Sequence, residues 1–249
     1  MCGVDIGSIV SWMRVEIWSD VVCPWCYIGK RRFETALERV RDLPGADQIE
    51  VVYRPYQLDP TASPGRVQPV AEAYAKKFGG PERATEILDR VTAVAAADGI
   101  TFNMDRALRA NTLLAHRLLW RAEIMGNQIA LKERLLAAYF TEGLNIGDPD
   151  VLAACAADVG FDIDDTRAFL EGDDGRGEVM QDLALAASNG ITAVPTFVIN
   201  GQWAIPGAQD VDVFERVFER LLAKEAEQLA VDAEHLPIGH VCVDDVCDV

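Results

Sequence analysis

The feature that most constrains the fold is the segment Cys23–Cys26 (CPWC), which stands between a strand pattern and a helix pattern. Val15–Trp18 before it alternates and is rich in residues that favour strands. Apolar residues recur at helical spacing over Phe33–Val40 after it. Pro24 suits the first turn of a helix, where its missing N–H group costs nothing. The sequence therefore predicts two cysteines at the start of a helix that follows a strand.

Two thiols at this position predict a redox centre, because a helix N-terminus carries unpaired N–H groups and a positive dipole end. Both favour a thiolate, so we expect the pKa of Cys23 to lie below the free value of about 8.5. Cys26 is placed to close a disulfide with it. A zinc ribbon also uses CxxC but needs a second ligand pair nearby in space, and an inert structural pair is the remaining alternative. The context favours Cys23 and Cys26 as candidate catalytic residues, with no metal.

Charge and hydropathy exclude several classes of partner. The 249 residues include 40 acidic and 23 basic side chains, for a formal net charge of −17. Such a surface repels nucleic acid and anionic lipid, and there is no apolar run of 18 residues to form a membrane span. The first thirteen residues contain no Lys or Arg, unlike a signal peptide. We therefore expect a cytoplasmic protein, in which a CxxC is more often catalytic than structural.

The remaining elements follow from turn signals and periodicity. β-Branched and aromatic residues predict a second strand, which a long helical stretch follows. After that stretch, Asn200-Gly201 predicts a hairpin between two strands. Proline and glycine punctuation sets most helix limits. The predicted strands are Ile49–Gln57, Val194–Ile199 and Gln202–Ile205, and the predicted helices are Pro81–Gly99, Arg106–Met125, Gln128–Thr141, Pro149–Gly160, Asp165–Leu170, Gly175–Asn189 and one that begins at Asp210.

This order predicts an α/β thioredoxin fold, βαβ–α–ββ–α, interrupted by an all-helical insertion. Residues 14–60 and 178–225 would form the discontinuous thioredoxin-like domain, 61–177 the insertion and 226–249 a flexible C-terminal tail. Pro195 supports the fold, because a proline at the start of a central strand is unusual. It fits if the Val194–Pro195 bond is cis and lies against the cysteines.

Several motifs in the same order give the chain a family resemblance over residues 14–225. It resembles the DsbA-like thioredoxin superfamily, and within it the branch of FrnE-like proteins and 2-hydroxychromene-2-carboxylate isomerases. The motifs are Ser19–Gly29 (SDVVCPWCYIG), Tyr56–Pro60 (YQLDP), Asn111–Arg117 (NTLLAHR), Tyr139–Glu142 (YFTE), Ile146–Asp148 (IGD) and Val194–Phe197 (VPTF).

The resemblance implies a thiol–disulfide oxidoreductase or disulfide isomerase that acts on proteins or small molecules. Its electron partner would be a low-molecular-weight thiol, mycothiol or glutathione, or a thioredoxin system, with no cofactor bound. The branch also includes small-molecule isomerases and kappa-class glutathione transferases, which generally have serine at the position of Cys23. A thiol-dependent isomerase or transferase for small aromatic compounds, and a non-catalytic holdase, remain alternatives. The direction of redox chemistry and the choice between monomer and homodimer stay open.

Four further residues are candidates for supporting roles. Asp59 ends a strand on the side that borders the active site in open α/β sheets, although a turn role before a proline is the alternative. His116 would face the cysteines from the helical insertion, or be a packed histidine. Trp25 is expected to be an exposed rim residue, and the Val194 backbone to offer an edge to an extended peptide.

The other cysteines have different expected roles. Cys155 lies among alanines and is expected to be a small buried hydrophobe. Cys242 and Cys247, in the acidic tail, are a candidate second redox pair that exchanges with Cys23–Cys26. A metal clip that also uses His235 and His240, and an inert tail, are the alternatives.

Overall fold

The computed structural model describes residues 13–234, in which a four-stranded sheet has the strand order β2–β1–β5–β6. The central strand β1 (Met13–Ser19) pairs in parallel with β2 (Ile49–Pro55) and antiparallel with β5 (Thr196–Ile199). The edge strand β6 (Trp203–Pro206) pairs antiparallel with β5 through the predicted hairpin. Because β1 is central, the residues that follow it emerge from the middle of the sheet.

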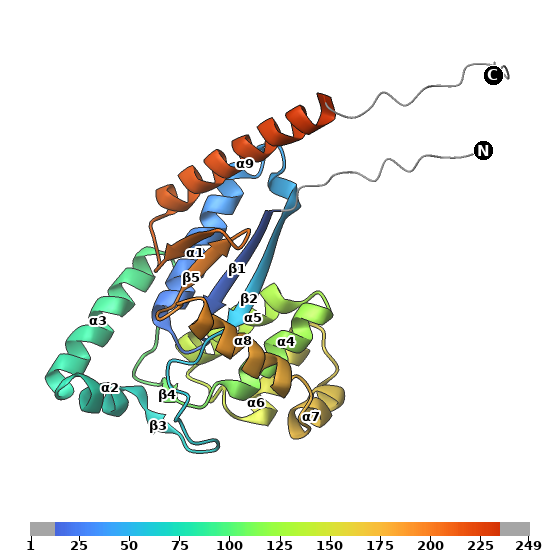
Figure 1. Cartoon of the computed structure of the whole chain (residues 1–249). Helices are drawn as coiled ribbons and strands as arrows, with labels where there is room; N and C mark the ends of the chain where they lie inside the picture. Colours follow the sequence, from blue (N-terminus) through green and yellow to red (C-terminus); the bar gives the residue numbers. More distant parts are fainter. Residues whose placement is uncertain (1–12, 235–249) are drawn as a thin grey trace, which may run out of the picture.

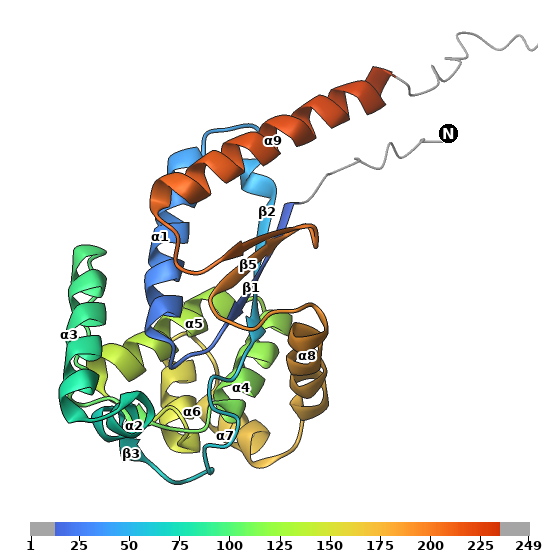
Figure 2. The ribbon, with the colours of Figure 1, turned by 60° about the vertical axis from the view of Figure 1, so that its left-hand side comes forward.

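Two helices cover one face of this sheet, as Figures 1 and 2 show. They are α1 (Pro24–Val40) and α9 (Val211–Glu234). Phe33 of α1 lies between Phe197 of β5 and two phenylalanines of α9, with ring centroids 5.2 to 5.7 Å apart. The burial of these rings is the main stabilising contribution to this sandwich. On the opposite face Trp18 packs against α8 (Arg176–Ser188).

The helical region lies beyond the carboxyl end of β1, below the sheet in Figure 2. It has its own hydrophobic cluster, built from leucines and aromatic residues of several helices. Its elements are a short ribbon of β3 (Gln68–Pro69) and β4 (Leu108–Arg109), then α2 (Val70–Phe78), α3 (Pro81–Ala97), α4 (Leu113–Ile124), α5 (Gln128–Ala137), the π-turn Ala138–Glu142, α6 (Pro149–Ala157) and α7 (Ile163–Glu171).

Helix α1 belongs to both cores. Tyr27 and Ile28 in its first turns pack in the cluster of the helical region, whereas Phe33 and Val40 pack in the cluster of the sheet. The sequence boundaries place this helix wholly in the thioredoxin-like domain. In the structure its N-terminal turns are the junction between the two cores, and the cysteines lie at that junction.

The predicted fold is confirmed, but some element limits were wrong. The helix predicted from Arg106 begins at Leu113, because Leu108–Arg109 pairs with β3 and the Asn111 side chain accepts from the Leu113 N–H. Residues 226–234, predicted to open the flexible tail, continue α9. None of the helices between residues 13 and 234 has the length and apolar character needed to cross a bilayer.

Candidate active site

The cysteine pair occupies the first turn of α1, as the sequence predicts. Cys23 is the residue before the helix, with extended backbone angles, and Pro24 is its first helical residue. The Cys26 N–H donates to the Cys23 carbonyl at 3.0 Å, which holds the two cysteines on one turn. Both are free thiols, with only 3% and 2% of their surface exposed. The pair is thus a dithiol sunk into the junction between the two cores.

The loop before β5 closes over Cys23. The Val194–Pro195 peptide bond is cis, the isomer expected from the sequence, and Cys23 Sγ lies 3.6 Å from the Val194 carbonyl oxygen. The Pro195 ring packs on Gly29, where an added Cβ would lie 3.0 Å from Cγ of the proline. The structure therefore brings the CxxC and the Val194–Pro195 loop together from opposite ends of the chain.

The two sulfurs have unequal environments. The hydrogen bond to Cys26, followed by burial, raises the pKa of the Cys23 thiol well above its usual value. Burial also raises the pKa of Cys26, but the hydrogen bond from Cys23 and the positive charge of Lys132 outweigh it and lower that pKa. The expectation of a lowered pKa at Cys23 was wrong for this arrangement, because the charge of the pair rests on the inner sulfur.

Asp20 and His116 connect the helical region to the segment before the cysteines. His116 lies on α4, and its Nε2 is 3.2 Å from Asp20 Oδ1 and 3.0 Å from the Tyr56 carbonyl oxygen. The other Asp20 oxygen accepts from the Leu58 N–H at 2.8 Å. Both side chains are buried. His116 therefore holds the Asp20 segment in place, and within residues 13–234 no hydrogen bond joins its ring to either sulfur.

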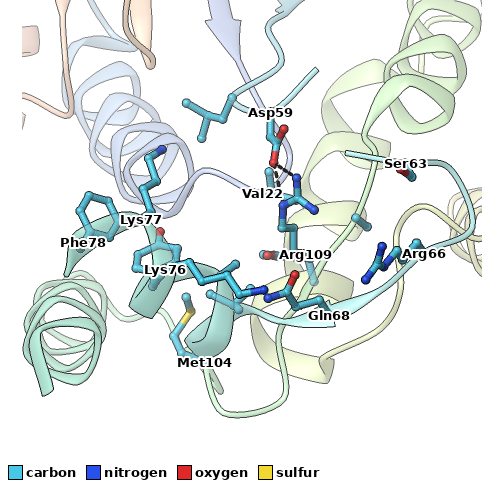
Figure 3. A pocket seen from close by; sticks show the side chains of 16 residues that line it. Val22, Asp59, Ser63, Arg66, Gln68, Lys76, Lys77, Phe78, Met104 and Arg109 are labelled. Atoms are coloured by element: carbon cyan, nitrogen blue, oxygen red, sulfur yellow. Dashed lines mark hydrogen bonds and ion pairs between the residues drawn. The ribbon is translucent and has the colours of Figure 1, made fainter. Parts of the chain in front are cut away.

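A pocket of about 540 Å³ reaches the residue that precedes Cys23. Val22, the residue before Cys23, lies on its wall beside Asp59 and Arg109 (Figure 3). Two further wall residues, Tyr74 and Tyr139, are phenols whose pKa values are raised, chiefly by burial. The chain directly before Cys23 therefore borders a cavity large enough for a small ligand.

The rim of this pocket is cationic, which is unusual for so acidic a chain. Arg66, Lys76 and Lys77 line it, and none of them has an ion pair among residues 13–234 (Figure 3). Asp59 faces the same pocket but is engaged by Arg109 and by the Thr61 hydroxyl at 2.7 Å. Asp59 thus anchors a turn and neutralises Arg109, and no described contact joins it to the cysteines.

The remaining candidates are placed as follows. Trp25 is 42% exposed, Trp18 is core, and Cys155 is buried in the helical region, as expected. Within the described part of the chain no three His, Cys, Asp or Glu side chains are arranged to hold a metal ion. The proposed second pair, Cys242 and Cys247, and the alternative ligands His235 and His240 lie outside the described residues.

Sequence reasoning missed Lys132 on α5. Its side chain is buried, with 1% exposed, and its charge acts on Cys26. Seen only with its neighbours Leu131 and Glu133, Lys132 has the character of a surface residue. However, it precedes Leu135 and Leu136 by three and four positions, so it falls on the apolar stripe of its helix. A charge on such a stripe is the signal that could have identified it.

Comparison with known proteins places the chain among relatives of the same fold. Residues 14–219 match the family described as DSBA-like thioredoxin domain. The uncharacterized protein YwbO of Bacillus subtilis is 32% identical over 206 residues, which cover 82% of this chain and 94% of YwbO. A probable DsbA oxidoreductase from Streptomyces coelicolor, SCO1869, is 34% identical with a TM-score of 0.77, covering 95% of this chain and 99% of that one.

More distant structures share the fold alone. A 2-hydroxychromene-2-carboxylate isomerase is 16% identical with a TM-score of 0.61, covering 86% of this chain and 98% of the isomerase. The cytosolic disulfide reductase DsbM from Pseudomonas aeruginosa, solved with GSH, is 16% identical with a TM-score of 0.59, covering 84% of this chain and 99% of DsbM.

Proposed function

Since the chain belongs to the DSBA-like thioredoxin family, we propose that it is a thiol–disulfide oxidoreductase whose reactive pair is Cys23 and Cys26. The observation that carries the proposal is the asymmetric placement of the pair. Cys23 precedes α1, beside the Val194 carbonyl and next to Val22 on the pocket wall, whereas Cys26 is acted on by the buried Lys132 and Ser19. The outer sulfur is placed to meet a substrate and the inner one to resolve the product.

The proposed reaction starts from a reduced pair in which Cys26 carries the negative charge. Cys23 passes its proton to Cys26 as its sulfur attacks a substrate disulfide, R–S–S–R′. The bond from Cys23 to R–S forms, the substrate S–S bond breaks, and R′S⁻ leaves and takes a proton from solvent. Cys26 then gives its proton to solvent and attacks Cys23 Sγ, which forms the Cys23–Cys26 disulfide, breaks the bond from Cys23 to R–S and releases RS⁻, which takes a proton from solvent. The pair gives two electrons to the substrate, and the reverse sequence oxidises a dithiol.

The electron partner proposed here is a small thiol that carries carboxylates, such as glutathione, in the cytoplasm. The support is the cationic rim formed by Arg66, Lys76 and Lys77 next to Cys23 in a chain of net charge −17. Fold likeness to a cytosolic reductase solved with GSH points the same way. Mycothiol, which has no carboxylate, and a thioredoxin system would make less use of these cations. Protein disulfides remain proposed substrates, with the Val194 backbone as an edge for an extended peptide.

A second candidate function is a thiol-dependent isomerase or transferase for small aromatic compounds. The observation that favours it is the size of the pocket and the apolar side chains of Phe78 and Met104 on its wall. In such an enzyme the bound small thiol does the chemistry, so activity would survive the loss of Cys26. The two functions therefore differ in what they require of the inner cysteine.

The test is the turnover of glutathione disulfide and of a protein disulfide by three variants of the full chain. We expect Cys23→Ser to lower turnover on the order of 10³-fold or more, because the attacking sulfur is lost. Cys26→Ala should accumulate a mixed disulfide on Cys23, measured by mass spectrometry. Cys155→Ser is the matched control, since this buried cysteine lies away from the site, and it should turn over normally.

Each outcome separates the alternatives. Normal turnover by Cys26→Ala with thiol substrates would overturn the oxidoreductase proposal in favour of the transferase. Chaperone-like suppression of aggregation that survives loss of both cysteines, with no redox activity in the natural chain, would leave a holdase.

A further inference from the structure

Two buried polar side chains act on Cys26, Lys132 through its charge and Ser19 through its hydroxyl, and both lower the pKa of Cys26. Lys132 Nζ is one of only three buried side-chain nitrogen or oxygen atoms that lack a hydrogen-bond partner among residues 13–234. Ser19 ends β1, whereas Lys132 comes from α5 of the helical insertion. An unpaired buried ammonium is costly, so its place here needs an explanation.

Both side chains border the same small internal cavity, of about 10 Å³. That volume is at the lower limit for one water molecule. Tyr53 completes the surroundings of Lys132, with its ring centroid 5.3 Å from Nζ. The cavity is too small for a substrate, and no partner of opposite charge forms an ion pair with Lys132 in the described part of the chain.

The other charged groups around this cavity are already engaged. Arg54 of β2 pairs with Asp182 of α8 at 3.3 Å, and with Glu123 of α4 at 3.7 Å. Among nearer groups, Asp20 is held by His116, and Lys30 of α1 pairs with Glu34 and Glu133. The groups left to balance Lys132 are the sulfurs, above all Cys26.

We propose that Lys132 is a positioning residue for the resolving cysteine, a buried cation that holds Cys26 as the thiolate and loses its counter-charge when the disulfide closes. This inference rests on the proposed function. In the resolving step Cys26 attacks Cys23 Sγ, the bond from Cys23 to R–S breaks, and RS⁻ takes a proton from solvent. The new disulfide is neutral, so Lys132 keeps a positive charge with no anion beside it. The cation therefore favours the reduced pair over the disulfide.

The effect of Lys132 on the redox equilibrium should depend on pH with a definite sign. Burial lowers the pKa of Lys132 to about 8. The cation is thus present at neutral pH and is lost as the pH rises through that value. Its preference for the reduced pair should be full at pH 6 to 7 and absent by pH 10.

The experiment is the equilibrium of the full chain with a glutathione redox buffer from pH 6 to pH 10, with the Cys23–Cys26 disulfide quantified by mass spectrometry after the free thiols are alkylated. We expect Lys132→Met to shift the equilibrium toward the disulfide by about tenfold at pH 6 to 7, the effect of one buried charge contact. The two proteins should converge above pH 9. Lys30→Met is the matched control: it removes a lysine that is also buried but is paired by carboxylates, and it should shift the equilibrium less than twofold.

A second variant keeps the test decisive if Lys132→Met does not fold. Lys132→Arg keeps a cation that does not titrate, so it should match the natural chain at pH 7 and stay displaced from it at pH 10 toward the reduced pair. An unchanged equilibrium in Lys132→Met, or a shift of equal size at every pH, would overturn the role of Lys132. Absence of any redox equilibrium in the natural chain would instead overturn the proposed function.

Discussion

The two sides of the cysteine pair differ in almost every physical property, although the pair itself is two identical side chains on one helical turn. On the side of Cys23 lies a pocket of about 540 Å³ with a cationic rim, open to ligands. On the side of Cys26 lies a cavity of about 10 Å³ with one buried cation and one hydroxyl. The proposed roles of the two sulfurs therefore follow from the surroundings that the fold supplies, and not from the CxxC motif.

The contrast also bears on how the proposed reactive dithiol could work while almost fully buried. The hydrogen bond between the sulfurs lets the inner one hold the charge and act as the base for the outer one. A lone buried cysteine has no such partner: burial, followed by the nearby charges of Glu142 and Asp158, raises the pKa of Cys155 in spite of Arg134. The two kinds of buried cysteine in this chain therefore differ in the neighbour that each thiol has.

The largest change should come from the Asp20–His116 contact, which fixes the segment between the two sides. His116→Phe leaves the buried carboxylate of Asp20 with only the Leu58 N–H as a partner. We expect the free energy of unfolding to fall by about 2–3 kcal/mol, measured by urea denaturation. The double variant with Asp20→Asn should lose less than the sum of the single losses. Strict additivity would show that the contact does not join the two sides.

A smaller change should follow from crowding the Cys23 side alone. In Gly29→Ala the new methyl group meets the Pro195 ring at 3.0 Å and Ala208 at 3.4 Å. We expect a loss of about 1–2 kcal/mol in the free energy of unfolding, from overpacking, together with slower attack by Cys23. Gly177→Ala is the matched control in α8, where the methyl group meets nothing within 4 Å, and it should stabilise the chain by about 0.5–1 kcal/mol. Equal effects at the two glycines would mean that the packing of Pro195 against α1 is loose.

The smallest change should come from the pocket rim. Lys76→Ala and Lys77→Ala each remove one exposed cation. An ion pair between such a cation and a bound carboxylate would contribute about 0.2–1 kcal/mol. The KM for glutathione disulfide should rise about two- to fivefold, less at high salt, with kcat unchanged. Lys224→Ala on α9, which removes an exposed cation near Trp203, should leave KM unchanged. If the KM for a neutral disulfide rises as much, the rim does not recognise carboxylates.

The sequence was most informative where chemistry and local structure coincide. Pro24 at the first helical position and the spacing from Phe33 to Val40 place Cys23 and Cys26 at the start of α1 without tertiary knowledge. The Val194–Pro195 loop was also found, because a proline next to a hairpin signal is rare in a central strand. These predictions needed only short segments and a known order of elements.

What the sequence could not provide was the charge balance around the sulfurs. The lowered pKa was expected at Cys23 from the helix terminus, whereas Lys132 is 106 positions from Cys26 and acts on the inner sulfur instead. The start of α4 was misplaced for a similar reason, since the pairing of Leu108–Arg109 with Gln68–Pro69 is a tertiary contact. Both errors arise where a distant segment overrides a local pattern.

The long separation of Cys23 from Val194 has a consequence for the making of the protein. These residues are 171 positions apart, and β1 lacks its neighbour β5 until the last part of the chain has left the ribosome. A nascent chain carries both thiols through most of its synthesis, but not the loop that completes the site around them. Under the proposed function, the emerging cysteines are without the Val194–Pro195 loop until β5 has been made.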